Sequence, residues 1–412
     1  MRRIWQLFLG IMAATGGFVD IGELVFTVQA GAQFRYMLLW VTVLGTIGII
    51  LFSEMCGRIA AIPKLTTFHI IKNKFGPKLG FATLLASNIV NVMTCAAELG
   101  GVAIILRLLF GGKYSLWLIA VTAMLIGTIL LLPFKYIERV FGLSGLIMIT
   151  FVVVAIALHP QWIELAKGFI PRIPGGDRQH LLLYAYFAVG IFSALLMPYE
   201  VYFYSSGGIE EEWEHTDLPD NKLTSIVGFS MGAVVSAALI VVGAAFYAPR
   251  QLNPAELGSS ALAPAFQFGK VGLLLALLGM LATVAGSAVE TCLAGAYNFC
   301  QFFHYKWGRR LSPNETPVFT KTWIIIFVLA MGITLTGYDP IKIVEYSVIF
   351  AVVVLPLTYA PILIVASDKT IMGKYANSKL QRVLGWTMFA LVTIAAAAAI
   401  PLMIVTEMGK KG

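Results

Sequence analysis

Long apolar runs recur along the whole chain and constrain its fold more than any other feature. About 20 predominantly apolar residues are enough for a helix to cross the hydrocarbon core of a bilayer. Eleven such runs lie at 4–30, 36–56, 80–110, 115–133, 137–158, 181–206, 223–247, 270–303, 318–336, 341–366 and 383–405. With 59% hydrophobic and 12% charged residues, the composition also lies outside the range of soluble domains. We therefore predict an all-α integral membrane protein surrounded by the lipid bilayer, because helices satisfy their own backbone hydrogen bonds in lipid.

The loops between these runs differ in their content of Lys and Arg. A cytoplasmic N-terminus makes 57–79, 134–139, 207–222, 304–322 and 367–382 the cytoplasmic loops, and these carry more Lys and Arg than the external loops. This bias predicts that the N-terminus is cytoplasmic and, with an odd number of spans, that the C-terminus is outside. The net charge of +8 is spread over loops rather than gathered on one face, so we expect no nucleic-acid partner.

Two of the runs are interrupted near their middle. The first contains GGFVDIGE, in which Asp20 and Glu23 lie one helical turn apart among glycines, and the sixth contains SALLMPYEVYFYSS at 193–206. Pro198 removes a backbone donor there and disfavours helix at the residue before it. Interrupted helices at matching places of two halves are typical of transporters with an inverted repeat. We expect one transmembrane domain over 1–412, with repeats at about 4–158 and about 181–366 and an extra helix at about 383–405.

Several acidic residues lie at the predicted depth of the membrane, and no Lys or Arg lies mid-span to neutralise them. A charged side chain at the centre of a bilayer costs roughly 2.5–3.5 kcal/mol on insertion scales. The acids are Asp20, Glu23, Glu98, Glu200, Glu290 and Glu345. An interfacial position explains Glu345 equally well, and hydrogen bonds to nearby Ser, Thr or Asn would explain Glu98 and Glu290. For the acids in the two breaks, we predict an exogenous cation or protons as the compensating charge.

The ligand types available at the breaks leave the identity of the cation open. Carboxylates of Asp20, Glu23 and Glu200, with unwound carbonyls near Ala194, favour Mg²⁺, Ca²⁺ or Mn²⁺. The thioether of Met197 favours a transition metal, although filling of the core is the simpler explanation for that residue alone. Further polar candidates near the breaks are Glu98, Tyr199, Tyr204 and Glu290.

No motif of an enzyme stands out in the sequence. We find no HExxH, no GxSxG and no Ser/His pairing at a plausible depth, so we expect neither an enzyme nor a cofactor. The four cysteines lie in or next to the runs without a CxxC pair, and we expect them to be small apolar fillers. They are Cys56, Cys95, Cys292 and Cys300.

Four segments resemble motifs of the NRAMP family of divalent metal transporters. DIGELVFTVQAGAQFRYMLLWV, from Asp20, resembles the first-span motif, which is DPGN followed by a stretch ending in QAG-x-x-FGY-x-LLW. ALLMPYEVYFYSS, from Ala194, resembles the sixth-span motif, which is A-x-x-MPH followed by a hydrophobic stretch and HSS. AAEL at 96–99 and LPLTYAPIL at 355–363 resemble the third-span LAE and tenth-span LPFALIPIL segments. The resemblance implies a LeuT-type 5+5 inverted repeat with broken helices 1 and 6.

The same resemblance implies a metal bound between the two breaks. By position, Asp20 would supply a carboxylate, Ala194 its carbonyl and Met197 its sulfur, while Glu23 replaces the asparagine of the motif. Departures from the family pattern are equally clear. Ile21 replaces the motif proline, tyrosines replace both sixth-span histidines, Cys95 replaces the third-span aspartate, the ninth-span arginine pair is missing, and Val348 occupies a tenth-span polar position.

These departures remove most of the family's route for protons. Histidine exchanges protons near neutral pH, whereas tyrosine, with a pKa of about 10, does not. The pattern is similar to the distant NRAMP-related magnesium transporters of prokaryotes, where a roomier site is thought to accept a more hydrated ion. Mg²⁺ dehydrates reluctantly, and the added acid at Glu23, with help from Glu200, suits such an ion. Met197 argues the other way, because an ordinary NRAMP uses it to favour Mn²⁺ or Fe²⁺.

Our leading hypothesis is a prokaryotic cell-membrane transporter for Mg²⁺, with Mn²⁺ also carried, that is weakly coupled or uncoupled to protons. The first alternative is a proton-coupled Mn²⁺/Fe²⁺ importer that uses Glu98 or Glu290 as its relay. An amino-acid permease of the same architecture is a second alternative, but Asp20 and Glu23 would repel the carboxylate of its substrate. A receptor with an ion as its signal also stays open. The sequence predicts no particular oligomeric state.

Overall fold

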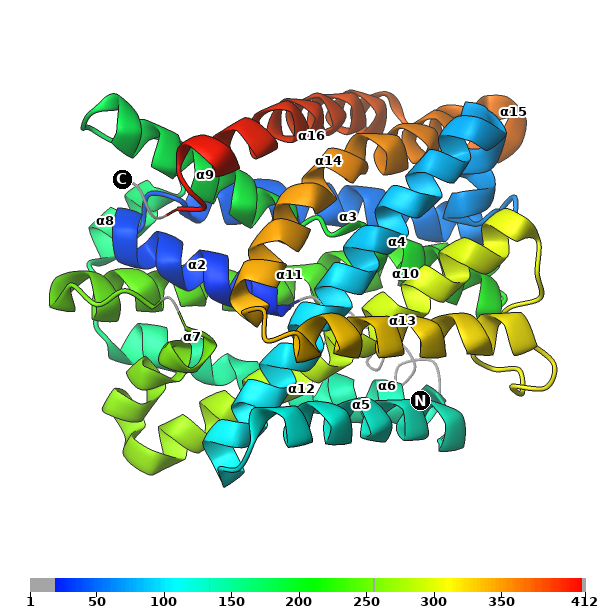
Figure 1. Cartoon of the computed structure of the whole chain (residues 1–412). Coiled ribbons are helices and arrows are strands. Elements are labelled where there is room, and N and C mark those ends of the chain that lie inside the picture. The colour runs from blue at the N-terminus through cyan, green and yellow to red at the C-terminus, as the bar shows by residue number, and fades with distance from the viewer. Residues whose placement is uncertain (1–18, 133, 255, 410–412) are drawn as a thin grey trace.

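The computed structural model describes residues 19–132, 134–254 and 256–409, and within these residues the chain is helical without a strand (Figure 1). Ten spans in this part of the chain are long and apolar enough to cross a membrane. They are α3 (Leu39–Ala61), α4 (Thr67–Phe110), α5 (Tyr114–Leu131), α6 (Phe134–Gly145) continued by α7 (Ile149–Ala157), α9 (Arg178–Ala194) continued by α10 (Pro198–Glu210), α11 (Leu218–Val242), α12 (Leu262–Phe303), α13 (Pro317–Leu335), α14 (Pro340–Ser367) and α16 (Lys379–Val405). Each overlaps one of the predicted runs from the second to the eleventh. Of the first run, α2 (Ile21–Phe34) is described, and residues 4–18 lie outside the described part.

Two helices begin earlier than the apolar runs predict. α4 starts at Thr67 instead of residue 80 and passes a kink at Gly76, which has φ of 77° and precedes Pro77. α12 starts at Leu262 instead of residue 270 and passes a kink at Gly269, which has φ of 61°. Glycine adopts these positive φ values without the strain that a side chain would cause. Hydropathy misses both extensions because a helix can continue beyond the apolar segment, as α4 does through its lysines.

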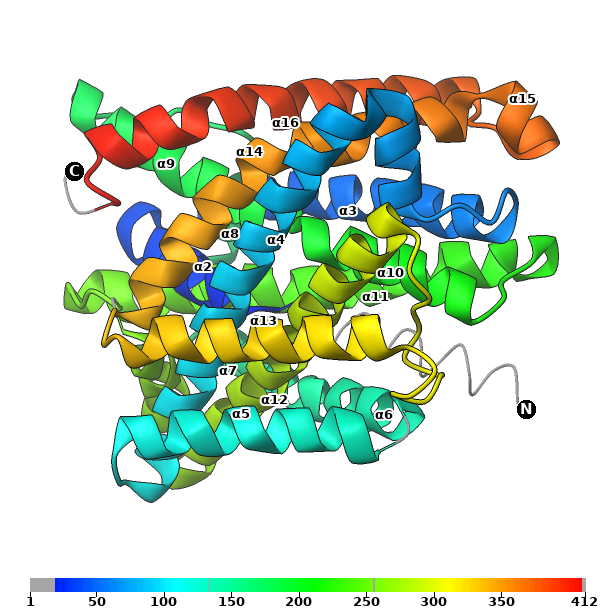
Figure 2. The same cartoon turned by 45° about the vertical axis from the view of Figure 1, so that its right-hand side comes forward.

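The central helices run obliquely through the molecule, and the least buried helices cover it from outside. In Figures 1 and 2, α4 and α12 cross the bundle at a slant, whereas α5, α13 and α16 lie along its sides. Of the 18 most apolar consecutive residues of α4, 72% are buried. The corresponding share is 22% in α5 and 28% in α16. The outer helices therefore present their apolar side chains to the surroundings, as expected for contact with lipid.

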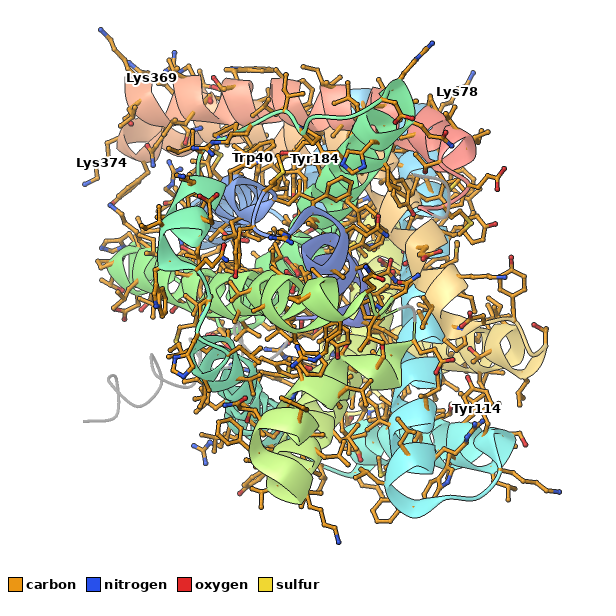
Figure 3. All side chains as sticks on the ribbon, turned by 90° about the vertical axis from the view of Figure 1, so that its left-hand side faces the viewer. Trp40, Lys78, Tyr114, Tyr184, Lys369 and Lys374 are labelled. Carbon is orange, nitrogen blue, oxygen red and sulfur yellow. The ribbon has the colours of Figure 1, made fainter. Side chains whose placement is uncertain are left out.

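Polar side chains divide between the surface and a few internal contacts. Lys78, Lys369 and Lys374 extend outward from the bundle (Figure 3). Trp40 on α3 and Tyr184 on α9 lie side by side, and the Trp40 Nε1–H donates a hydrogen bond of 2.9 Å to the Tyr184 hydroxyl. Such a partner is needed when an indole or phenol is placed between helices.

The sixth span is broken where the sequence predicts. α9 ends at Ala194, α10 begins at Pro198, and Met197 caps α10 with extended ψ of 129°. Proline suits the first helical position because its missing N–H would have no helical partner there. In the first span, Asp20 forms the N-cap of α2. Both spans therefore present a helix N-terminus next to an acidic residue in the interior of the protein.

α2 is held tightly against α11 and the π-helical turn Gly243–Tyr247 that follows it. A Cβ atom on Gly31 would lie 2.1 Å from the carbonyl oxygen of Ile240, and one on Gly243 would lie 2.3 Å from that of Val28. Only glycine permits this approach of two backbones, a packing mode that is common between membrane helices. The contact fixes α11 relative to the start of α2, where the acids lie.

Candidate metal-binding site

Asp20, the N-cap of α2, lies beside the break of the sixth span. Its side chain is fully buried, and its Oδ1 accepts a hydrogen bond of 2.9 Å from the backbone N–H of Glu23. Its Oδ2 accepts a longer bond of 3.4 Å from the hydroxyl of Tyr199 at the start of α10. The first acid of the sequence pattern therefore lies beside the sixth-span break.

Glu23 lies one turn further along α2 and is also fully buried. The hydroxyl of Ser236 on α11 donates to its Oε1 over 2.8 Å. Its Oε2 has no hydrogen-bond partner among the described residues. A buried carboxylate oxygen without a partner is costly, so this atom is a candidate ligand for a cation.

Glu98, from the middle of α4, is linked to Asp20 through two hydroxyls. Its Oε1 accepts from the backbone N–H of Ile21 over 3.2 Å and from the Ser287 hydroxyl over 3.3 Å. The hydroxyls of Ser287 and Tyr199 are 3.0 Å apart. With the Tyr199–Asp20 contact, these bonds form a buried chain from Asp20 through Tyr199 and Ser287 to Glu98. The Oε2 atom of Glu98 has no partner among the described residues.

The sixth-span break contributes the remaining predicted ligands. Met197 is fully buried, and Glu200, in the first turn of α10, is 6% exposed. Neither carboxylate oxygen of Glu200 has a hydrogen-bond partner among the described residues, and the charges of Glu23 and Asp20 act on it. The carbonyl of Ala194 lacks its usual helical donor, because residue 198, four positions on, is a proline.

No basic side chain neutralises these acids within the part of the chain that the structure describes. The buried or half-buried ion pairs there lie elsewhere. They are Arg58–Glu54 at 2.9 Å, Arg309–Glu210 at 3.1 Å and Arg309–Glu211 at 3.7 Å. The first of these pairs explains Glu54 as a structural residue. The acids around the breaks therefore remain uncompensated among the described residues, and their negative charge would attract a cation.

Acidic side chains alone do not complete a metal shell. No group of three or more His, Cys, Asp or Glu side chains in the described residues is arranged to hold an ion. An ion at the breaks would therefore need other ligands, for which the sequence predicts the Ala194 carbonyl and the Met197 sulfur. The side chain of Val348 on α14 lies beside Gly22, with its methyl group 2.7 Å from where a Cβ would stand, but it adds no ligand because it has no oxygen, nitrogen or sulfur atom.

Tyr204 lies apart from this arrangement, whereas Glu290 lies close enough for its charge to act on Glu200. The Tyr204 hydroxyl donates to Oδ1 of Asn221 over 2.8 Å, and its ring packs on Trp213 with 5.5 Å between centroids. Tyr204 thus belongs to the packing of α10 with the start of α11. Glu290 on α12 and Glu345 on α14 are only half-buried. The four cysteines are buried and free, as expected of apolar fillers.

Sequence reasoning missed the two serines that hold the acids. Ser236 lies in the apolar stretch GAVVSAALI, and Ser287 lies one turn before Glu290. A hydroxyl within an otherwise apolar span was the available signal, but many such hydroxyls bond only to their own helix. Only the packing of α11 against α2 and of α12 against α4 shows that the hydroxyls of Ser236 and Ser287 bond to acids of another helix.

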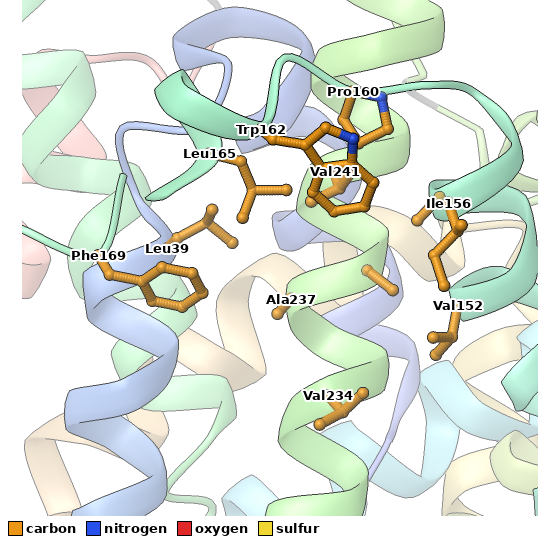
Figure 4. A pocket seen from close by; sticks show the side chains of 12 residues that line it. Leu39, Val152, Ile156, Pro160, Trp162, Leu165, Phe169, Val234, Ala237 and Val241 are labelled. Carbon is orange, nitrogen blue, oxygen red and sulfur yellow. The ribbon is translucent and has the colours of Figure 1, made fainter. Parts of the chain in front are cut away.

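A separate cavity lies between α3, α7, α8 (Trp162–Gly168) and α11 (Figure 4). It measures about 160 Å³ and is lined by apolar side chains, among them Leu39, Phe169, Val234 and Val241. None of the predicted ligands contributes to its wall. Because no side chain of its lining carries an oxygen or sulfur atom, this cavity is a poor candidate for a metal site.

Comparison with known proteins points to one family. The profile described as natural resistance-associated macrophage protein-like (Nramp) matches residues 10–401. The divalent metal cation transporter MntH of Levilactobacillus brevis is 25% identical, with 93% of this chain and 88% of that protein covered. MntH of Listeria innocua is 27% identical, with 90% and 84% covered, and MntH 1 of Pseudomonas aeruginosa is 25% identical, with 94% and 90% covered.

Solved structures agree with the expected fold class. The manganese transporter of Eremococcus coleocola superposes with a TM-score of 0.74 at 21% identity, over 98% of this chain and 89% of that chain. A Na⁺-coupled sialic acid symporter gives a TM-score of 0.52 at 13% identity, with 95% of both chains covered. The prediction of an all-α membrane protein with the LeuT-type architecture is confirmed.

Proposed function

Because the chain belongs to the natural resistance-associated macrophage protein-like (Nramp) family, we propose that it transports divalent metal cations across the membrane. The relatives named above are divalent metal cation transporters, and the structural neighbour from Eremococcus coleocola is a manganese transporter. The observation that carries the proposal is the contact between Tyr199 and Asp20. It brings the start of α2 to the sixth-span break, beside acids without a basic partner among the described residues.

The proposed binding site lies between the breaks of the first and sixth spans. Its ligands are the carboxylates of Asp20, Glu23 and Glu200, the carbonyl of Ala194 and the sulfur of Met197. The proposal is supported by the buried oxygens of Glu23 and Glu200, which lack hydrogen-bond partners among the described residues. A dication would stabilise these oxygens, and water would complete its coordination.

The proposed substrate is Mg²⁺, with Mn²⁺ also carried. Three carboxylates and a carbonyl form a hard, anionic ligand set, which suits a strongly hydrated ion. Met197 supplies the soft ligand that would keep Mn²⁺ as a second substrate.

We further propose that transport is weakly coupled or uncoupled to protons. A phenol, that of Tyr199, occupies the hydrogen-bond chain between Asp20 and Ser287, where an imidazole would exchange protons near neutral pH. One observation favours the alternative, a proton-coupled Mn²⁺ importer. Glu98 is linked to Asp20 through this same chain and could carry the proton.

Transport into proteoliposomes tests these proposals. Mn²⁺ uptake by the wild type should fall when Mg²⁺ is present in excess, and the pH of the lumen should stay constant during uptake. Uptake that excess Mg²⁺ leaves unchanged would contradict the magnesium proposal. Acidification that accompanies Mn²⁺ entry and disappears in Glu98→Gln would favour the proton-coupled alternative.

A further inference from the structure

Ser236 on α11 contacts Glu23 of the proposed site. By the resemblance described above, Glu23 stands where the family motif has asparagine. Its hydroxyl is 2.8 Å from Oε1 of Glu23 and 3.2 Å from the carbonyl oxygen of Gly232 in its own helix. A hydroxyl has one proton, and a carboxylate accepts it more strongly than a backbone carbonyl does. The shorter distance agrees, so the Ser236 proton belongs to Glu23.

The position of Ser236 is fixed by the packing of two helices. α2 and α11 touch backbone to backbone where Gly31 meets Ile240 and where Gly243 meets Val28. These contacts lie about one to two turns beyond Glu23 on α2 and about one to two turns beyond Ser236, at the end of α11 and the start of the π-helical turn. Ser236 is itself fully buried, so water cannot replace its hydroxyl without a change in this packing.

The hydrogen bond makes the two oxygens of Glu23 unequal. Oε1 is occupied by Ser236, whereas Oε2 is buried without a partner among the described residues. Oε2 can therefore be offered to a cation freely, whereas Oε1 would have to share its lone pairs between the Ser236 proton and the cation. Ca²⁺ readily takes both oxygens of a carboxylate and up to eight ligands, whereas Mg²⁺ demands six ligands in near-ideal octahedral geometry.

We infer that Ser236 is a specificity-determining residue, which weakens Oε1 of Glu23 as a ligand, favours coordination through Oε2 alone and thereby disfavours Ca²⁺ relative to Mg²⁺. Ser236 acts through Glu23 and does not itself bind the ion. The inference rests on the proposed function, since it concerns the selectivity of that same site.

Competition in proteoliposomes tests it. Mn²⁺ uptake is measured with increasing Ca²⁺ or Mg²⁺, and the ratio of the two half-inhibiting concentrations is compared between variants. In Ser236→Ala, Oε1 is released and Ca²⁺ should inhibit about tenfold better relative to Mg²⁺. Ser236→Thr keeps the hydroxyl and should preserve the wild-type ratio. Ser236→Cys, a weaker donor of similar size, should give an intermediate ratio and serves if the alanine variant does not fold.

Ser225 provides a matched control on the same helix. It is fully buried, and its hydroxyl donates only to the carbonyls of Asn221 and Lys222, at 3.0 Å and 3.1 Å. Ser225→Ala should therefore leave the ratio unchanged. An unchanged ratio in folded Ser236→Ala or Ser236→Cys, or an equal change in Ser225→Ala, would overturn the inference while the proposed function stands. Absence of any dication uptake by the wild type would overturn both.

Discussion

At the scale of single residues, Asp20 has two roles that a substitution can separate. It caps α2 through the Glu23 N–H, and it contributes charge beside the sixth-span break. Asparagine caps a helix about as well as aspartate but carries no charge. A change to asparagine therefore tests the charge and largely spares the helix.

We predict that Asp20→Asn lowers Mn²⁺ uptake by at least about tenfold, because ligand charge sets the affinity for a dication. The temperature of unfolding in detergent should stay close to that of the wild type. Asp177, the exposed N-cap of α9, makes the same bond to a backbone N–H, that of His180, at 2.8 Å. Asp177→Asn is thus the matched control and should transport normally. If Asp20→Asn took up Mn²⁺ as fast as the wild type, Asp20 would not be a ligand of the site.

Tyr199 and Tyr204 permit a second paired test, since both stand where the family pattern has histidine. Tyr199→His would place an imidazole beside Asp20. Below a pKa of about 6.5 the imidazolium would pair with Asp20 and compete with the metal, and above it the ring is neutral. Uptake by this variant should therefore fall roughly tenfold as the pH falls from about 7.5 to about 5.5.

Tyr204→His supplies the comparison, because Tyr204 bonds to Asn221 and not to Asp20. Its uptake should follow the pH profile of the wild type. Identical pH profiles for Tyr199→His and the wild type would mean that position 199 does not communicate with the ion.

At the scale of helices, much could be predicted from the sequence. Apolar length located the spans, and Pro198 located the break between Ala194 and Met197, because both features are local. The hydroxyl partners of the acids could not be predicted in the same way. Whether Ser236 bonds to its own helix or to Glu23 depends on how closely α11 approaches α2, which is a property of the folded packing.

The close approach of α2 and α11 leads to a prediction about stability. In Gly31→Ala the new Cβ would lie 2.1 Å from the Ile240 carbonyl oxygen, so the two helices must move apart. Overpacking of this kind costs about 1–3 kcal/mol. We expect a lower unfolding temperature in detergent and, because Ser236 would withdraw from Glu23, stronger inhibition of Mn²⁺ uptake by Ca²⁺ relative to Mg²⁺.

Gly127 on α5 is the control, since a Cβ there meets nothing within 4 Å. Gly127→Ala should be neutral or slightly stabilising, because alanine favours helix by up to about 1 kcal/mol over glycine. Equal stability of the two alanine variants would show that α2 and α11 can move apart without loss of stability.

At the scale of the whole molecule, the arrangement of the helices relates the chain's loops to one another. The external loop predicted at 159–180 and the cytoplasmic loop predicted at 367–382 lie at opposite ends of the bundle, near α8 and α15 (Lys369–Met372), respectively (Figure 1). The described C-terminal residues lie at the same end as α8 (Figure 1). The excess of Lys and Arg in the loops predicted to be internal indicates that the end near α15 faces the cytoplasm.

Labelling of intact cells with a membrane-impermeant maleimide tests the orientation. All four native cysteines are at most 1% exposed, so the wild type should remain unlabelled. We predict labelling of Arg172→Cys, in the loop at 159–180, because this loop has the lower density of positive charge and is translocated. Lys374→Cys should react only after the membrane is made permeable. The reverse pattern would place the C-terminus in the cytoplasm and would contradict the predicted orientation.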